Sequence, residues 1–211
     1  MKTSTGPSSD IYKIDRSKDN AVYYRIPIIR DFFQWRLKAA IALVSDESTG
    51  RVLDVGYGGG FLFPFLSSRF ECIHGADWHS HGQMVCDHYA SNGIVVRATK
   101  SDIRSLPYRD NSFDAVFCLS LLEHMNEIDR AVGELFRVLK PYGQAVLGYP
   151  PRTALTSALF NLIGFDHKRL HPMGHTEIYN ALSRKFIMDT SVSIPRIGSL
   201  YVLWRCVKRG E

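Results

Sequence analysis

A cluster of glycines near residue 56 has the composition of a loop that binds a ligand through its backbone. Gly56, Gly58 and Gly60 directly follow the apolar run Val-Leu-Asp-Val. Glycine tolerates positive φ and lets a ligand approach the backbone without meeting a Cβ atom. At a strand-to-helix turn of an open parallel sheet, such a loop lies where ligands bind. On their own, the same glycines would suit a plain tight turn equally well.

The residues around this loop select among nucleotide-type ligands. A dinucleotide-binding loop has the pattern Gly-x-Gly-x-x-Gly, so that a pyrophosphate lies on the helix N-terminus. Here Phe61 takes the place of the third glycine, and the Gly-Lys-Ser/Thr ending of a P-loop is absent from the sequence. Asp54 precedes the loop, where its carboxylate repels an anion and favours an ammonium-bearing ligand. The pattern therefore disfavours a nucleotide-cofactor oxidoreductase.

Two further acids follow predicted strands. Asp77 ends the run His-Gly-Ala-Asp, and its carboxylate is able to accept hydrogen bonds from both hydroxyls of a ribose. Trp78 comes next and offers an aromatic face, although tryptophan also serves in cores and on surfaces. Asp102 and Ile103 come after the third predicted strand. As isolated loop residues, both aspartates would instead act as turn or cap residues.

A parallel sheet is needed to bring these residues to one edge. Short apolar runs predict strands at 51–55, 71–76, 93–98, 113–119 and 144–149. Helical spacing of apolar residues predicts helices at 28–44, 61–69, 80–91, 128–139, 155–163 and 176–184, with Thr176 as an N-cap. Two last runs, 187–194 and 199–207, suit a hairpin. We therefore predict an α/β fold with a Rossmann-like doubly wound, mainly parallel seven-stranded sheet and a closing antiparallel hairpin.

Length and composition predict one folded domain. The chain has 211 residues, of which 45% are hydrophobic and 22% charged, and these values exclude fibrous, low-complexity and wholly disordered proteins. Residues 1–20 are polar and predict a mobile leader. Residues 21–211 form a single domain in this interpretation, in which no room is left for a separate nucleic-acid-binding domain.

Charge and targeting signals indicate a soluble setting. The net charge of +5 is scattered along the chain, so we assign it to solvated surface. No apolar stretch approaches the ~18 residues that span a bilayer, and the start does not have the pattern of a signal peptide. The four cysteines form no Cys-x-x-Cys pair, as is usual for reduced thiols. We expect a cytoplasmic protein without a transmembrane segment.

Five motifs in order and spacing resemble the class I S-adenosylmethionine-dependent methyltransferases, in particular the UbiE-like or type 11 small-molecule group. They are the loop 54–60, the acid at 77, the segment 101–103, the strand and exit 113–124 and the Leu-Lys-Pro turn near 140. The resemblance covers about residues 23–150. Tyr57, Gly59 and Tyr142 depart from the commonest family pattern, which affects only the finer geometry of the loop and of the turn.

The resemblance implies S-adenosylmethionine as cofactor and a set of binding residues. Asp54 would hold the glycine loop and help to receive the amino group, while Asp77 accepts from the ribose and Trp78 lies against the adenine. Asp102 would accept from the exocyclic amine and Ile103 would present its N–H to the ring. The predicted cofactor-binding set is Asp54, Gly56, Gly58, Gly60, Asp77, Trp78, Asp102, Ile103, Leu119 and Ser120.

The segment 150–186 is expected to cover the acceptor site. A general base is needed only if the acceptor must lose a proton, and His171 and His175 are the candidates for it. With His167, these residues have the spacing of three ligands on one helix face, but Pro172 and Gly174 interrupt the helix. We therefore expect no metal site.

Other activities remain as alternatives at this point. The fourth strand exits as Leu-Ser-Leu-Leu, which lacks the Asn/Asp-Pro-Pro-Tyr pattern of enzymes that methylate planar amino groups. A small-molecule or lipid-like acceptor is the main hypothesis. An RNA methyltransferase, which the basic composition allows, and a non-catalytic protein that binds a nucleotide cofactor are the alternatives.

Overall fold

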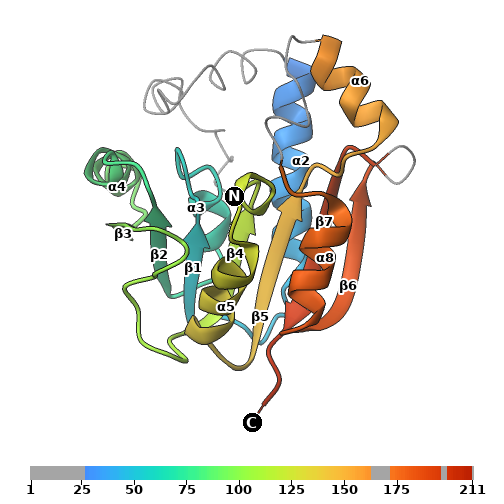
Figure 1. Ribbon diagram of the computed structural model, residues 1–211. Helices are drawn as coiled ribbons and strands as arrows, with labels where there is room; N and C mark the ends of the chain where they lie inside the picture. Colours follow the sequence, from blue (N-terminus) through green and yellow to red (C-terminus); the bar gives the residue numbers. More distant parts are fainter. Residues whose placement is uncertain (1–26, 163–171, 196–198, 211) are drawn as a thin grey trace.

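The sheet has seven strands in the order β3-β2-β1-β4-β5-β7-β6 (Figure 1). A computed structural model describes residues 27–162, 172–195 and 199–210. The strands are β1 (Arg51–Val55), β2 (Cys72–Asp77), β3 (Val96–Lys100), β4 (Phe113–Leu119), β5 (Leu139–Tyr149), β6 (Ile187–Ile194) and β7 (Tyr201–Val207). Strands β1 to β5 are parallel, and β7 pairs antiparallel with both β5 and β6. The predicted fold class and hairpin are confirmed.

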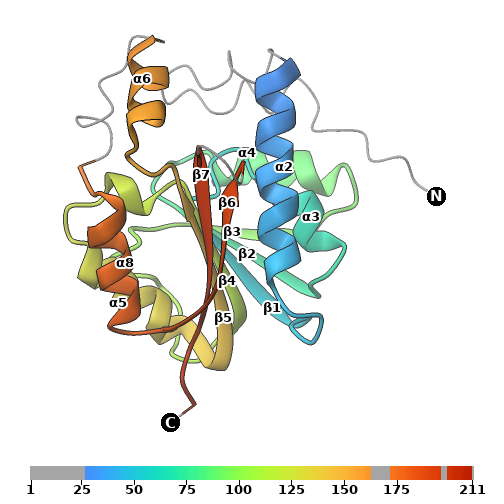
Figure 2. The ribbon, with the colours of Figure 1, turned by 90° about the vertical axis from the view of Figure 1, so that its right-hand side faces the viewer.

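Helices cover both faces of the sheet (Figure 2). They are α2 (Pro27–Leu43), α3 (Phe63–Ser67), α4 (Gly82–Ala90), α5 (Ile128–Val138), α6 (Ala154–Leu162) and α8 (His175–Ser183), with a 3-10 turn at Leu122–His124. Helices α5 and α8 lie on one face, whereas α2, α3 and α4 lie on the other (Figure 2). Each face therefore has its own apolar core, and the sheet is the middle layer of three.

Strand β1 marks the position at which the chain changes direction across the sheet. It lies between β2 and β4. The sheet grows from it through β2 and β3 on one side and through β4 and β5 on the other. Four of its five residues are buried, as a central parallel strand requires. Ligands of doubly wound sheets bind beyond such a switch point, and the glycine loop begins there.

Several predicted boundaries are corrected. The helix expected at 61–69 is only Phe63–Ser67, because the Gly60 N–H donates to Tyr57 and the Phe63 N–H to Gly60 in successive turns. The third strand begins three residues later than predicted, at Val96. Thr176 is not an N-cap, since α8 begins at His175 after an extended Gly174. Residues 1–20, the predicted leader, lie outside the described residues.

None of the helices within the described part of the chain combines the length and apolar character that crossing a bilayer requires.

Candidate active site

The glycine loop has the backbone that its sequence predicts. Gly56, Gly58 and Gly60 have φ values of 76°, 53° and 74°, a region that residues with a Cβ atom adopt at a cost. A Cβ on Gly56 would lie 3.0 Å from Leu121, and one on Gly60 would lie 2.6 Å from the Phe63 ring. The bare backbone is therefore required for conformation and for packing.

Asp77 connects the end of β2 to this loop. Its Oδ2 accepts a hydrogen bond from the Gly58 N–H at 2.8 Å, and its Oδ1 accepts from the His79 N–H at 3.3 Å. The His79 Nε2 atom lies 2.9 Å from the Gly58 carbonyl oxygen. A carboxylate has about four acceptor positions, so Asp77 can still accept from a ligand while it holds the loop.

Asp54 is the second acid at this edge of the sheet. It is buried, and desolvation together with the nearby charge of Asp77 raises its pKa to about 8. A cationic ligand group would offset both effects, because opposite charge favours the ionised carboxylate. The electrostatics of the loop therefore favour the ammonium-bearing ligand that the sequence predicts.

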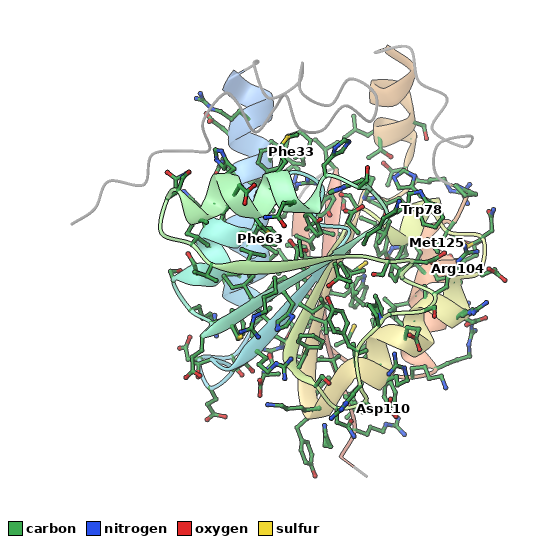
Figure 3. The ribbon with its side chains drawn as sticks, turned by 90° about the vertical axis from the view of Figure 1, so that its left-hand side faces the viewer. Phe33, Phe63, Trp78, Arg104, Asp110 and Met125 are labelled. Atoms are coloured by element: carbon green, nitrogen blue, oxygen red, sulfur yellow. The ribbon has the colours of Figure 1, made fainter. Side chains whose placement is uncertain are left out.

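A cavity of about 290 Å³ opens beside the glycine loop, close to the lower end of the range for small-molecule sites. Trp78, Arg104 and Met125 lie together at its side (Figure 3). Trp78 is 71% exposed, so its ring is available to a ligand. Five predicted cofactor residues line the cavity: Gly56, Asp77, Trp78, Asp102 and Ile103.

The remaining predicted cofactor residues do not line this cavity. They are Asp54, Gly58, Gly60, Leu119 and Ser120. The first three belong to the loop or to the strand before it, and they shape the cavity through the backbone. Leu119 packs with the core on the α2 face.

Asp102 is already held by a neighbour. Arg104 donates to it through Nη2 at 2.6 Å and through Nε at 3.0 Å, and these bonds lower the pKa of the Asp102 carboxyl. Arg104 also donates to Glu127 at 2.5 Å. The carboxylate therefore remains ionised, and any ligand amine shares it with the guanidinium.

Ser120 faces away from the cavity towards α2. Its Oγ accepts from the Arg36 Nη1 at 2.8 Å and lies 2.9 Å from the Tyr201 hydroxyl. We call Arg36, Ser120 and Tyr201 the Arg36 cluster. Ser120 has a φ of 57°, which is a strained value for serine. The side chain is thus held between helix α2 and strand β7.

Glu123 lies in the 3-10 turn after β4 and is 1% exposed. Neither carboxylate oxygen has a hydrogen-bond partner among the described residues. Burial raises its pKa to about 8, although the charge of Arg36 acts in the opposite direction. Glu123 is therefore mostly protonated at neutral pH.

The structure describes one of the two predicted histidine candidates. His175 is exposed at the start of α8, and its Nδ1 lies 3.1 Å from the hydroxyl of the buried Tyr149. His167 and His171 lie outside the described residues. Across residues 27–162, 172–195 and 199–210, no three His, Cys, Asp or Glu side chains gather as ligands for a metal ion.

Sequence reasoning missed several residues of the site. Leu121, Met125 and Arg104 line the cavity, and the first two come directly after β4, where a ligand-binding loop is expected. Arg36 and Tyr201 had no such signal. They reach Ser120 across sequence separations of 84 and 81 residues.

Comparison with known proteins identifies the family. The family model described as "Methyltransferase domain" matches residues 53–147. A demethylmenaquinone methyltransferase of Deinococcus radiodurans is 33% identical over 166 residues, which are 76% of this chain and 68% of that relative. The chain belongs to the class I S-adenosylmethionine-dependent methyltransferases.

Two further relatives are also methyltransferases, and a part of each lies outside the matched region. A demethylmenaquinone methyltransferase of Thermus thermophilus is 33% identical over 56% of this chain and 55% of its own length. A ubiquinone biosynthesis O-methyltransferase of Rickettsia felis is 26% identical over 85% of this chain and 74% of its own length. The chain thus spans from about half to three quarters of the length of these two methyltransferases.

Solved structures confirm the fold. The N-methyltransferase NodS from Bradyrhizobium japonicum, in complex with S-adenosylhomocysteine, has a TM-score of 0.72 at 14% identity and covers 97% of this chain and 99% of its own. The [4+2]-cyclase SpnF has a TM-score of 0.67 at 21% identity, covering 83% of this chain and 81% of its own. A fold that includes a cyclase does not by itself define the reaction.

The family to which the chain belongs uses S-adenosylmethionine as its cofactor, and the residues present fit it. Gly56 lines the cavity with its bare backbone, the charge that acts on the buried Asp54 is that of another acid, Asp77, and Asp77 has acceptor capacity beside the cavity. The sequence-based expectation of the cofactor is confirmed.

Proposed function

We propose that this protein transfers a methyl group from S-adenosylmethionine to a small-molecule or lipid-like acceptor. The observation that carries the proposal is a cavity at the carboxyl edge of the sheet that Gly56, Asp77 and Asp102 line, with the buried Asp54 in the strand that leads into the glycine loop. When bound, the cofactor supplies a methyl group on a sulfonium, which is already activated for in-line displacement. The protein then accelerates the reaction mainly by positioning and by excluding water.

The proposed roles of the residues follow from their places around the cavity. Asp77 accepts from the ribose hydroxyls, and Asp54 stabilises the amino group. Trp78 packs against the adenine, while Asp102 and Ile103 contact its edge. In this assignment Leu119 and Ser120 contribute to the methyl-transfer region only through the backbone that carries Leu121 into the cavity, because their own side chains do not line it.

The proposal also assigns the remaining parts of the chain. The segment 150–186 covers the acceptor, and His171 or His175 accepts a proton if the acceptor is a hydroxyl. His175 has a route for such a proton through the Tyr149 hydroxyl. The net charge of +5 is scattered, which supports a cytoplasmic small-molecule enzyme over one that binds nucleic acid.

Calorimetric titration with S-adenosylhomocysteine tests the cofactor assignment. We expect Asp77→Ala to weaken binding by about 1 to 3 kcal/mol, the cost of a lost charged hydrogen bond. Asp87→Ala is the matched control, because Asp87 is an exposed acid on α4 whose carboxylate accepts from Gln83 on the same helix and does not line the cavity. Unchanged binding in Asp77→Ala would overturn the ribose assignment.

A screen for transfer of labelled methyl from S-adenosylmethionine to fractionated metabolites tests the activity. Label in a small-molecule fraction supports the proposal. Label only in RNA, together with salt-sensitive RNA retention on a filter, would favour the RNA methyltransferase. Cofactor binding without transfer to any fraction would favour a non-catalytic binding protein.

A further inference from the structure

The Arg36 cluster lies next to the proposed methyl-transfer point. Ser120 follows β4 and precedes Leu121, whose side chain touches the Gly56 position and lines the cofactor cavity. The two hydrogen bonds of Ser120, at 2.8 and 2.9 Å, fix Arg36 and Tyr201 beside this point. Strained residues such as Ser120 cluster at functional sites. The cluster therefore lies on the α2 side of the strand end that leads into the cavity.

Arg36 has a positive charge that no described carboxylate neutralises by an ion pair. Its guanidinium carbon lies 4.2 Å from the centre of the Phe33 ring and 5.0 Å from that of Tyr201. The Nε atom is buried and has no hydrogen-bond partner among the described residues. Stacking on rings does not use the in-plane N–H groups of arginine. Because Nη1 donates to Ser120 and Nε is buried, Nη2 is the group that a ligand would contact.

The charge of Arg36 acts on the buried Glu123, whose carboxyl group is nevertheless mostly neutral. Its raised pKa, about 8, keeps the carboxyl protonated at neutral pH, and its oxygens form no ion pair within 4.0 Å. A neutral Glu123 leaves the charge of Arg36 available. Since an unpaired, half-buried cation is costly unless something compensates it, the site is complementary to an anion.

We infer that the acceptor carries an anionic oxygen, a carboxylate or a phenolate, which pairs with Arg36 while Ser120 and Tyr201 orient the guanidinium. The inference rests on the proposed function and narrows its substrate class. In this inference Arg36 is a substrate-binding residue and Tyr201 a positioning residue.

A purely structural role for Arg36 makes a different prediction. If Arg36 only anchors α2 to the sheet, its replacement lowers stability but does not change the relative affinity for charged and neutral compounds. Arg36→Lys retains the charge without the fork of N–H groups, and Arg36→Gln removes the charge. Arg30→Gln is the matched control, since Arg30 is exposed on the same helix and pairs with Asp31.

Fluorine NMR titration of the protein saturated with S-adenosylhomocysteine provides the test. The probes are 4-fluorobenzoate, pentafluorophenolate and the neutral 4-fluorobenzamide, so the two anion arms separate a carboxylate acceptor from a phenolate one. We expect at least one anion to bind about tenfold more tightly than the amide. Arg36→Gln should abolish this preference, Arg36→Lys should retain part of it, and Arg30→Gln should retain all of it.

The outcomes separate this inference from the proposed function. Equal affinity of all three probes for the native protein overturns the inference, and this comparison does not depend on whether a variant folds. An anion preference that persists in folded Arg36→Gln also overturns it. Loss of S-adenosylhomocysteine binding in the native protein would instead contradict the proposed function.

Discussion

The two halves of the carboxyl edge are built in different ways. On the proposed cofactor side, the loop 56–60 and the segment 101–104 each follow a strand directly, and Asp77, the last residue of β2, accepts from the Gly58 N–H only 19 residues away. On the acceptor side, the Arg36 cluster joins helix α2, the end of β4 and the start of β7 across more than 80 residues. The first half is specified by local sequence and the second by tertiary packing.

The largest effect should come from the cofactor side, at Gly60. Gly60→Ala combines a positive φ with a Cβ placed 2.6 Å from the Phe63 ring and 2.7 Å from the Tyr89 ring. We expect a loss of about 2 to 5 kcal/mol in the free energy of unfolding, the sum of backbone strain and overpacking. Urea denaturation measures this loss.

Gly93→Ala is the matched control for Gly60→Ala. Gly93 has a positive φ of 76°, close to the 74° of Gly60, but no atom lies within 4 Å of its Cβ position, so only the strain of about 1 to 2 kcal/mol remains. If the two variants are equally stable, the packing of the loop against Phe63 and Tyr89 does not hold the cofactor side together.

The second effect concerns the acceptor side, at Glu123. Its pKa is about 8 in the folded protein and near 4.5 in the unfolded chain, so the folded state binds more protons between these pH values. Stability should therefore fall as the pH rises through this window, by about 1.4 kcal/mol per pH unit at most. Glu123→Gln removes this contribution, so from pH 6 to pH 8 it should gain about 2 kcal/mol relative to the native protein.

Denaturation curves of native protein, Glu123→Gln and Glu47→Gln at the two pH values measure the difference. Glu47 is exposed and serves as the control, which should follow the native protein. A constant gap between native protein and Glu123→Gln would mean that Glu123 does not titrate in this range. Since Glu123 belongs to the acceptor side, its replacement should leave the affinity for S-adenosylhomocysteine within about twofold.

The third effect, at most as large per pH unit as the second, should appear in cofactor affinity as a function of pH. Asp54 has a pKa of about 8 in the free protein, and an ammonium beside it lowers that value, so binding releases a proton. Affinity for S-adenosylhomocysteine should rise by up to about tenfold per pH unit below pH 8 and level off above it. Calorimetry in buffers of different ionisation enthalpy measures the released proton.

Asp54→Asn should bind more weakly and without this slope. Asp114→Asn is the control, because Asp114 pairs with Lys140 at the opposite end of the sheet. A slope that persists in Asp54→Asn would assign the released proton to another group and would remove Asp54 from the amino-group site.

The contrast between the two sides explains what sequence alone predicts. The strands 51–55 and 113–119 match their predicted bounds, because each is a continuous apolar run with a clear turn signal beside it. The proposed cofactor residues could be predicted from sequence because they lie in such strands or directly after them. Helix 61–69 was predicted too long, since turn formation at Gly60 depends on contacts with Phe63 and Tyr89 that no local pattern reveals.

The acceptor side was largely invisible in the sequence. Arg36 lies within the predicted helix 28–44, where apolar spacing draws attention to the core residues and a single arginine resembles a surface charge. Tyr201 starts a strand that reads as one arm of a hairpin, and nothing local shows that β7 pairs with β5. Only the three-dimensional arrangement brings these side chains to Ser120.

Strand β5 contains Gly148, and the space beside this residue limits which side chains can be exchanged on the proposed acceptor side. A Cβ atom on Gly148 would lie 2.8 Å from the Tyr201 hydroxyl and 2.7 Å from its ring, so the tyrosine lies across space that a side chain at 148 would fill. Leu203, on the same strand as Tyr201, lies equally close to that Cβ position, at 2.7 Å, so both β7 residues would have to become smaller before position 148 could carry a larger side chain. Such a combined replacement would change the proposed acceptor side and leave the glycine loop untouched, because the loop follows β1, two strands away from β5 in the sheet.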